Sequence, residues 1–220
     1  MIISQQKPLD ELLDSLKDYK KIFLVGCGEC ATTCKSGGQP ELDKIKAALE
    51  AVGKTILGMC LPGAPCLAPQ IKTELAKNIK ALRDCEAVLV LACGLGVQSV
   101  KDNNRFNQAI IPANNTIFGA VMDAQGNFYE KCSMCSECVL AQTAGICPVT
   151  LCPKGLLNGP CGGMNKGKCE VDNENDCAWV LIYKELEKNN KLVSLREIRG
   201  PKDFKKSARP HKLIMNKFAH

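Results

Sequence analysis

The cysteines constrain this chain more than any other feature. Fifteen of its 220 residues are cysteine, and eight of them lie between residues 132 and 177, among Gly, Pro and Asn with almost no periodic apolar pattern. A segment of this composition has too little hydrocarbon to form a core by itself, so we expect bound metal to supply the missing stability.

The expected redox compartment decides how these thiols are interpreted. Asp10, Glu11 and Asp14 stand where a secretory signal would have a basic and then an apolar stretch, so we expect a cytoplasmic protein. No apolar run approaches the roughly 18 residues that a membrane span needs, and we expect no membrane segment. In a reducing compartment, clustered thiols indicate metal or redox chemistry rather than disulfides.

Histidine is almost absent from the chain. The two histidines, His211 and His220, lie in the last ten residues, so any metal in the body of the protein would be held mainly by thiolate. This excludes Cys2His2 fingers, metalloproteases and nucleophilic catalysis by Ser-His or Cys-His pairs.

The positive charge of the chain is concentrated in its tail. Residues 191–220 contain nine Lys or Arg and two Asp or Glu, a net charge of +7, whereas the whole chain carries +6. Each bound cubane cluster with four thiolates would add a charge of roughly −2 to the body. We therefore expect residues 191–220 to form an extended basic arm that docks on a partner subunit. Aromatic residues are too sparse there for base stacking, and we expect no nucleic acid.

Apolar periodicity predicts the organisation of the first part of the chain. Amphipathic helices are expected over residues 8–19 and from about residues 40 and 69, and buried strands over residues 22–25, 55–59, 87–91 and, as a fourth, 116–122. This alternation predicts an α/β fold, a small parallel-sheet Rossmann or flavodoxin-like domain over residues 1–127. A loop-rich, Cys-rich, ferredoxin-like iron–sulfur domain is expected over residues 128–190, with one helix from about residue 177, followed by the arm.

The first thiol constellation directly follows the first buried strand. Cys27, Cys30 and Cys34 form a C-x-x-C-x-x-x-C pattern, which offers three thiolates from one turn. The neighbouring glycines would free backbone N–H groups to point at inorganic sulfides; they are Gly26, Gly28, Gly37 and Gly38.

A fourth ligand for this turn is expected at the same edge of the sheet. The carboxyl ends of parallel strands gather ligands, and we favour Cys93, after the strand at 87–91, with Cys60, after the strand at 55–59, as the alternative. Cys85 lies at the opposite end of its strand and is interpreted as a packed thiol.

The same turn also matches the dinucleotide fingerprint G-x-G-x-x-A over residues 26–31. That signal is weak alone. The next strand ends at Met59 and Cys60, with no acidic residue for a ribose, so a dinucleotide-binding oxidoreductase is a minor alternative.

The second constellation has eight thiols, the number required for two four-cysteine sites. They are Cys132, Cys135, Cys138, Cys147, Cys152, Cys161, Cys169 and Cys177. C-x-x-C-x-x-C followed by Cys-Pro resembles a bacterial ferredoxin run, but eight residues separate Cys138 from Cys147 where the usual number is three. The pairing of ligands therefore stays open, and so does zinc at one of these sites, because C-x-x-C pairs also bind zinc.

These motifs carry a family resemblance over about residues 20–185. Four motifs resemble, in order, the small iron–sulfur subunit (MetV type) of the two-subunit methylenetetrahydrofolate reductases of acetogenic bacteria. They are Cys132-Ser-Met-Cys135-Ser-Glu-Cys138, Asn158-Gly-Pro-Cys161-Gly-Gly, Gly167-Lys-Cys169-Glu-Val-Asp172 and Asp176-Cys-Ala-Trp179. The run from Cys27 to Gly38 fits the N-terminal half of that family.

The resemblance implies a role in one-carbon metabolism. It implies a flavin-containing, barrel-fold partner subunit that reduces methylenetetrahydrofolate to methyltetrahydrofolate. The chain itself would pass electrons to that flavin from a low-potential donor, ferredoxin or another electron-donor protein, through two or three [4Fe-4S] clusters. The residues agree, because the chain has no flavin motif and no acid–base constellation at a strand end. The alternative is a zinc-binding scaffold or adaptor subunit.

Overall fold

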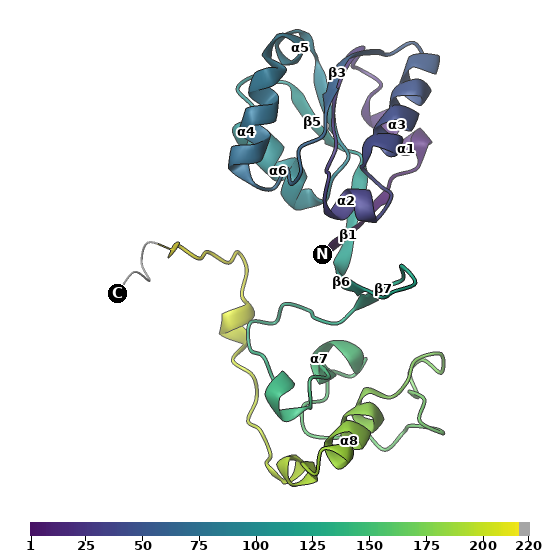
Figure 1. Ribbon diagram of the computed structural model, residues 1–220, viewed down its shortest axis with the longest axis vertical. Coiled ribbons are helices and arrows are strands. Elements are labelled where there is room, and N and C mark those ends of the chain that lie inside the picture. The colour runs from purple at the N-terminus through teal and green to yellow at the C-terminus, as the bar shows by residue number, and fades with distance from the viewer. Residues whose placement is uncertain (216–220) are drawn as a thin grey trace. The chain divides into compact units, whose positions relative to one another are not determined.

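The computed structural model describes residues 1–215, and the chain divides into two compact units, Met1–Ala120 and Val121–His220 (Figure 1). Each unit is described by itself. No helix in the described part of the chain has the length and apolar content needed to cross a membrane.

A four-stranded parallel sheet forms the centre of the first unit. Its order is β3 (Thr55–Cys60), β2 (Lys21–Val25), β4 (Ala87–Val90) and β5 (Ala109–Pro112). Both faces of the sheet are covered, which explains why β2 and β4 are continuous apolar runs. Phe23 and Val25 pack into one core, and Ile22 and Leu24 into the other, because successive side chains of a strand point to opposite faces.

Helices cover both faces of this sheet (Figure 1). The helices α1 (Leu9–Ser15) and α3 (Gln39–Ala51) pack on one face, and α4 (Ala68–Lys77), α5 (Ile79–Asp84) and α6 (Gly94–Asn103) on the other. The α3 helix begins where the sequence predicts, because Pro40 suits the first turn and the Glu41 carboxylate accepts a hydrogen bond from Gly38 N at 3.0 Å. The helix predicted from residue 69 is two helices, separated at Asn78.

The strand predicted over residues 116–122 does not belong to the parallel sheet, and that expectation was wrong. β6 (Asn114–Met122) pairs antiparallel with β1 (Ile2–Gln6), in a separate sheet of order β1-β6-β7 with β7 at Phe128–Glu130. The fourth parallel strand is β5, which is partly exposed and ends in a proline. β4 has the same length but is fully buried, so its apolar run was recognisable. The strand character of β6 does not specify its partner.

The second unit contains little regular structure. Its described residues form the short helix α7 (Pro148–Leu151), the longer helix α8 (Ala178–Lys188) and the 3₁₀ turns η1 (Leu140–Gln142), η2 (Leu192–Arg196) and η3 (Phe204–Ser207). Its core consists of Trp179, Ile182 and Leu186 of α8, packed against Ile146, Leu156 and other partly buried residues of the same unit. A core of this size agrees with the small apolar content of the segment.

Candidate metal centres

The turn after β2 presents the first thiols. The chain passes through Gly26, Cys27 and Gly28 into a single helical turn, α2 (Cys30–Thr33), and Thr32 Oγ1 donates to Cys27 O at 2.7 Å. Cys27 is buried, Cys30 is the first residue of α2, and Cys34 caps its carboxyl end.

The glycines of this turn allow close packing, and the prediction that their N–H groups are free for sulfide was wrong. Gly26 N donates to Cys60 O at 2.9 Å and Gly28 N to Pro62 O at 2.8 Å, while Gly37 N and Gly38 N also have acceptors within the protein. A Cβ atom at Gly26 would lie 2.7 Å from Gly37 O. Because α2 is one turn long and Gly28 N already donates to Pro62 O, the turn lacks the long helix that holds a dinucleotide phosphate.

Charge on Cys30 and Cys93 acts on two further thiols of the first unit, those of Cys27 and Cys66. Burial raises the pKa of the Cys27 thiol, hydrogen bonds from the Ala31 and Glu29 backbone lower it, and negative charge on Cys30 and Cys93 raises it. Partial desolvation raises the pKa of the Cys66 thiol, although the residue is exposed, and charge on Cys93 and Cys30 raises it further. Cys27, Cys30, Cys66 and Cys93 are called the sheet-edge thiols below.

Cys66 belongs to the loop of residues 61–67. This loop contacts the turn after β2 and the helix α6, which carry the other sheet-edge thiols. Besides the bond from Gly28 N to Pro62 O, the Cys27 thiol lies 3.9 Å from Gly63 O. On the other side, a Cβ atom at Gly96 of α6 would lie 3.1 Å from Pro65 Cγ, so the loop packs on the helix that Cys93 caps. Cys66 was not predicted as a ligand, because it lies in a loop beyond the strand ends where ligands of a parallel sheet are expected.

Cys34 and Cys60 differ in their surroundings. The Cys34 thiol lies 3.9 Å from Ile2 O, and Ile2 N donates to Cys30 Sγ at 3.5 Å, so Cys34 and the sheet-edge thiol Cys30 both contact β1. Cys60 is buried in the apolar core, where burial raises its pKa to about 12, and the charges acting on it belong to Glu74 and Lys77. Cys85 is buried in the same core with its pKa raised by burial to about 11, as a packed thiol would be.

The eight thiols of the second unit line two separate cavities. Cys132, Cys135, Cys138 and Cys147 line a cavity of about 190 Å³, called here the first thiol cavity. Cys152, Cys161, Cys169 and Cys177 line a cavity of about 20 Å³, called the second thiol cavity. The two sets do not interleave along the chain, and each contains four thiols.

The loop at the first thiol cavity has an unusual backbone. Met134 (φ 54°) and Ser136 (φ 62°) are in the left-handed region, which costs a non-glycine residue about 1–2 kcal/mol each. With this backbone, Met134 N donates to Cys132 Sγ at 3.4 Å. Strain of this kind persists where the surroundings hold the backbone, and it is common at ligand-binding sites.

Carboxylates beside the two cavities already have partners. Glu137, at the first thiol cavity, accepts from Asp203 N at 2.9 Å. Glu170, at the second, pairs with Lys154 and accepts from the Cys161 thiol at 3.5 Å. The groups left to bind metal in each cavity are therefore the four thiols, which suit iron–sulfur clusters and zinc.

The two cavities differ in volume. One water molecule needs a cavity of about 10–15 Å³, so the second thiol cavity, at about 20 Å³, has room for about one atom with the side chains as they stand, and the first, at about 190 Å³, is larger. Within residues 1–215, no three His, Cys, Asp or Glu side chains stand together at metal-binding distance. Donor type and donor number fit a four-thiolate centre in each cavity, with side-chain rotation needed to bring the sulfurs together.

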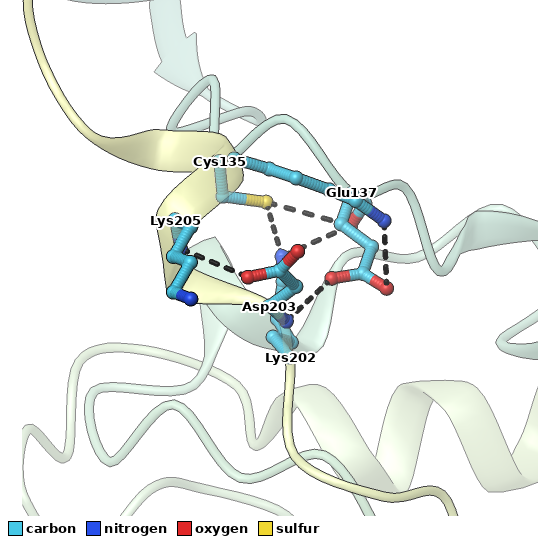
Figure 2. Close-up of polar contacts among 6 residues, drawn as sticks. Cys135, Glu137, Lys202, Asp203 and Lys205 are labelled. Carbon is cyan, nitrogen blue, oxygen red and sulfur yellow. Dashed lines mark hydrogen bonds and ion pairs between the residues drawn. The ribbon is translucent and has the colours of Figure 1, made fainter.

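Part of the basic arm lies on the Cys-rich segment of its own unit (Figure 2). Lys202 Nζ donates to Cys135 Sγ at 2.6 Å and to Glu137 O at 2.9 Å. The hydrogen bond from the Lys202 ammonium lowers the pKa of the Cys135 thiol. The arm was predicted to be extended and to dock on a partner, and the docking stays a prediction. Residues 199–206 contact this unit, and residues 216–220 of the arm lie outside the described residues.

Comparison with known proteins links the second unit to one enzyme family. Residues 111–205 match a family model described as "Methylene-tetrahydrofolate reductase C terminal". The matched segment contains both thiol cavities and Lys202. The chain matches none of the curated proteins. The match relates this part of the chain to methylenetetrahydrofolate reductase and so to oxidoreductase chemistry.

Proposed function

We propose that this chain is an electron-transfer subunit of a methylenetetrahydrofolate reductase. It would take electrons from a low-potential donor, ferredoxin or a similar protein, and deliver them to the flavin of a barrel-fold partner subunit that reduces methylenetetrahydrofolate to methyltetrahydrofolate. The observation that supports this most is the sorting of eight cysteines into two four-thiol cavities inside the segment that matches the reductase family.

The first thiol cavity is the proposed site of a [4Fe-4S] cluster. Its volume of about 190 Å³ admits a group of several atoms, and Cys147 lines it together with the C-x-x-C-x-x-C run. That grouping favours the local arrangement of three ligands plus one, despite the long gap before Cys147. A [4Fe-4S] cluster, when bound, accepts and donates one electron at a time.

The second thiol cavity is the proposed site of a structural zinc ion. Its volume of about 20 Å³ suits one ion surrounded by four thiolates better than a cubane. Trp179, which lines this cavity, donates from Nε1 to Leu156 O at 3.1 Å, so the site is continuous with the small core of the second unit. A metal held there would connect the loops that carry Cys152, Cys161 and Cys169 to the start of α8.

The sheet-edge thiols are the proposed ligands of a further [4Fe-4S] cluster. Cys27 and Cys30 come from the turn after β2 and Cys93 from the N-cap of α6, and β2 and β4 are neighbours in the sheet. Cys66 is the proposed fourth ligand, with Cys34 as the alternative.

Metal and sulfide analysis of anaerobically purified protein tests this assignment. We expect about eight iron, eight acid-labile sulfide and one zinc per chain. Cys135→Ser should remove about half of the iron and sulfide and leave the zinc, whereas Cys169→Ser should remove the zinc and leave the iron. Cys85→Ser, which alters a packed thiol, is the matched control and should change neither.

Two further results decide between the proposed role and a scaffold. With the clusters present, reduced ferredoxin should reduce the flavin of the partner subunit only when this chain is included. Zinc without acid-labile sulfide would contradict the electron-transfer role and support a zinc-binding scaffold or adaptor subunit.

A further inference from the structure

We propose that Lys202 is a positioning residue that raises the reduction potential of the centre held in the first thiol cavity. This inference rests on the proposed function, because it requires a cluster bound by Cys135. Lys202, a residue of the basic arm, would therefore have a role inside the second unit.

The contact itself is specific and long-range. Lys202 Nζ lies 2.6 Å from Cys135 Sγ and 2.9 Å from Glu137 O, although the lysine follows the cysteine by 67 residues (Figure 2). The ammonium therefore hydrogen-bonds the sulfur and the adjacent backbone of the same loop. The contact is partly buried, which weakens screening by water and salt.

The arm is attached to the unit on both sides of Lys202, so the ammonium is held in place. On the N-terminal side, Asn158 Nδ2 donates to Arg199 O at 3.0 Å and Arg199 N donates to Asn158 Oδ1 at 2.9 Å. On the C-terminal side, Asp203 N donates to Glu137 Oε2 at 2.9 Å and Lys206 Nζ lies 3.8 Å from Glu137 Oε1. Residues 199–206 are called the strap below.

A fixed cation beside a ligating sulfur favours the reduced state of a cluster. Reduction adds one electron, and a positive charge a few ångströms away stabilises the more negative form more strongly. Hydrogen bonds to cluster sulfurs act in the same direction, because they withdraw charge from the ligand. Removal of the ammonium should therefore make this centre harder to reduce.

A redox titration followed by EPR tests the inference on the anaerobically purified full chain. Lys202→Met should lower the midpoint potential of the centre whose signal Cys135→Ser abolishes, and Lys202→Arg should restore a value near that of the wild type. Lys205→Met is the matched control: it removes the same charge from the strap, where Lys205 contributes its backbone N–H to Asp203 Oδ1. The signal of the other centre, bound by the sheet-edge thiols, should keep its potential in every variant.

The outcomes separate this inference from the proposed function. Two results for a Lys202→Met protein with wild-type iron content overturn the role of Lys202 and leave the proposed function standing. One is an unchanged midpoint potential, and the other is a shift in midpoint potential equal to that of Lys205→Met. Absence of acid-labile sulfide from the wild type overturns both, and it is detected by analysis before any titration. If Lys202→Met fails to retain iron, Lys202→Gln, which keeps a neutral donor, provides the comparison and should also show a lower potential than Lys202→Arg.

Discussion

Cys66 lies in a loop that hydrogen-bonds the turn of Cys27 and packs on the helix capped by Cys93. We expect Cys66→Ser to abolish or alter the EPR signal of the centre bound by the sheet-edge thiols, because one of its four sulfurs is lost. Cys34→Ser should leave that signal in place. Cys60→Ser is the control, since this thiol is buried in the apolar core. A signal lost in Cys34→Ser and retained in Cys66→Ser would assign the fourth position to Cys34.

The position of a single residue in the fold was predictable from sequence where that residue directly follows a recognisable strand. Cys27, Cys30 and Cys93 follow the neighbouring parallel strands β2 and β4, so they lie at the same edge of the sheet, and their role as ligands stays a prediction. Cys66 follows its strand by six residues, and a loop of that length could run in many directions. The contact between Lys202 and Cys135 was not predictable either, since nothing in the local sequence records a partner 67 residues away.

The helix α8 provides most of the apolar side chains in the core of the second unit. Ile182 is fully buried, between Trp179 and Leu186 on one face of the helix. We expect Ile182→Ala to destabilise this unit by about 2–5 kcal/mol, since it leaves a cavity in a core with few other side chains to fill it. Hydrogen exchange should show lost protection in residues 121–215 and unchanged protection in the parallel sheet.

Tyr183→Ala, on the exposed side of the same helix, is the matched control and should have little effect on exchange. Equal loss of protection in the two variants would show that α8 stabilises the unit by its helical structure rather than by its buried face.

Among the elements, those with continuous or regularly spaced apolar residues were predicted most reliably. The α3 helix and strands β2, β3 and β4 are found where the sequence places them. β1, which is polar over Ser4–Gln6, and β5, which ends in a proline, were missed. β6 was assigned to the wrong sheet, because apolar alternation does not specify which strand will be the partner. Which sheet a strand joins depends on pairing with residues far away in the sequence, and the spacing of apolar residues within the strand does not specify that pairing.

The two units should respond differently to removal of metal. The first unit has a large apolar core on each face of its sheet, whereas the core of the second is small. We expect chelation of the metal, zinc included, to remove hydrogen-exchange protection from residues 121–215 while strands β2 and β4 stay protected. Simultaneous loss of protection in both units would contradict this expectation, as would full protection of metal-free residues 121–215.

The order of the two thiol cavities along the chain has a consequence for biosynthesis. The four cysteines of the first cavity end at Cys147, before the first cysteine of the second cavity at Cys152, and Lys202 follows all eight. One complete cysteine set therefore leaves the ribosome before the next begins. If each cavity holds its own metal centre, as proposed, the order of synthesis allows the first to be loaded before the second, and the strap reaches Cys135 only after both sets have been synthesised.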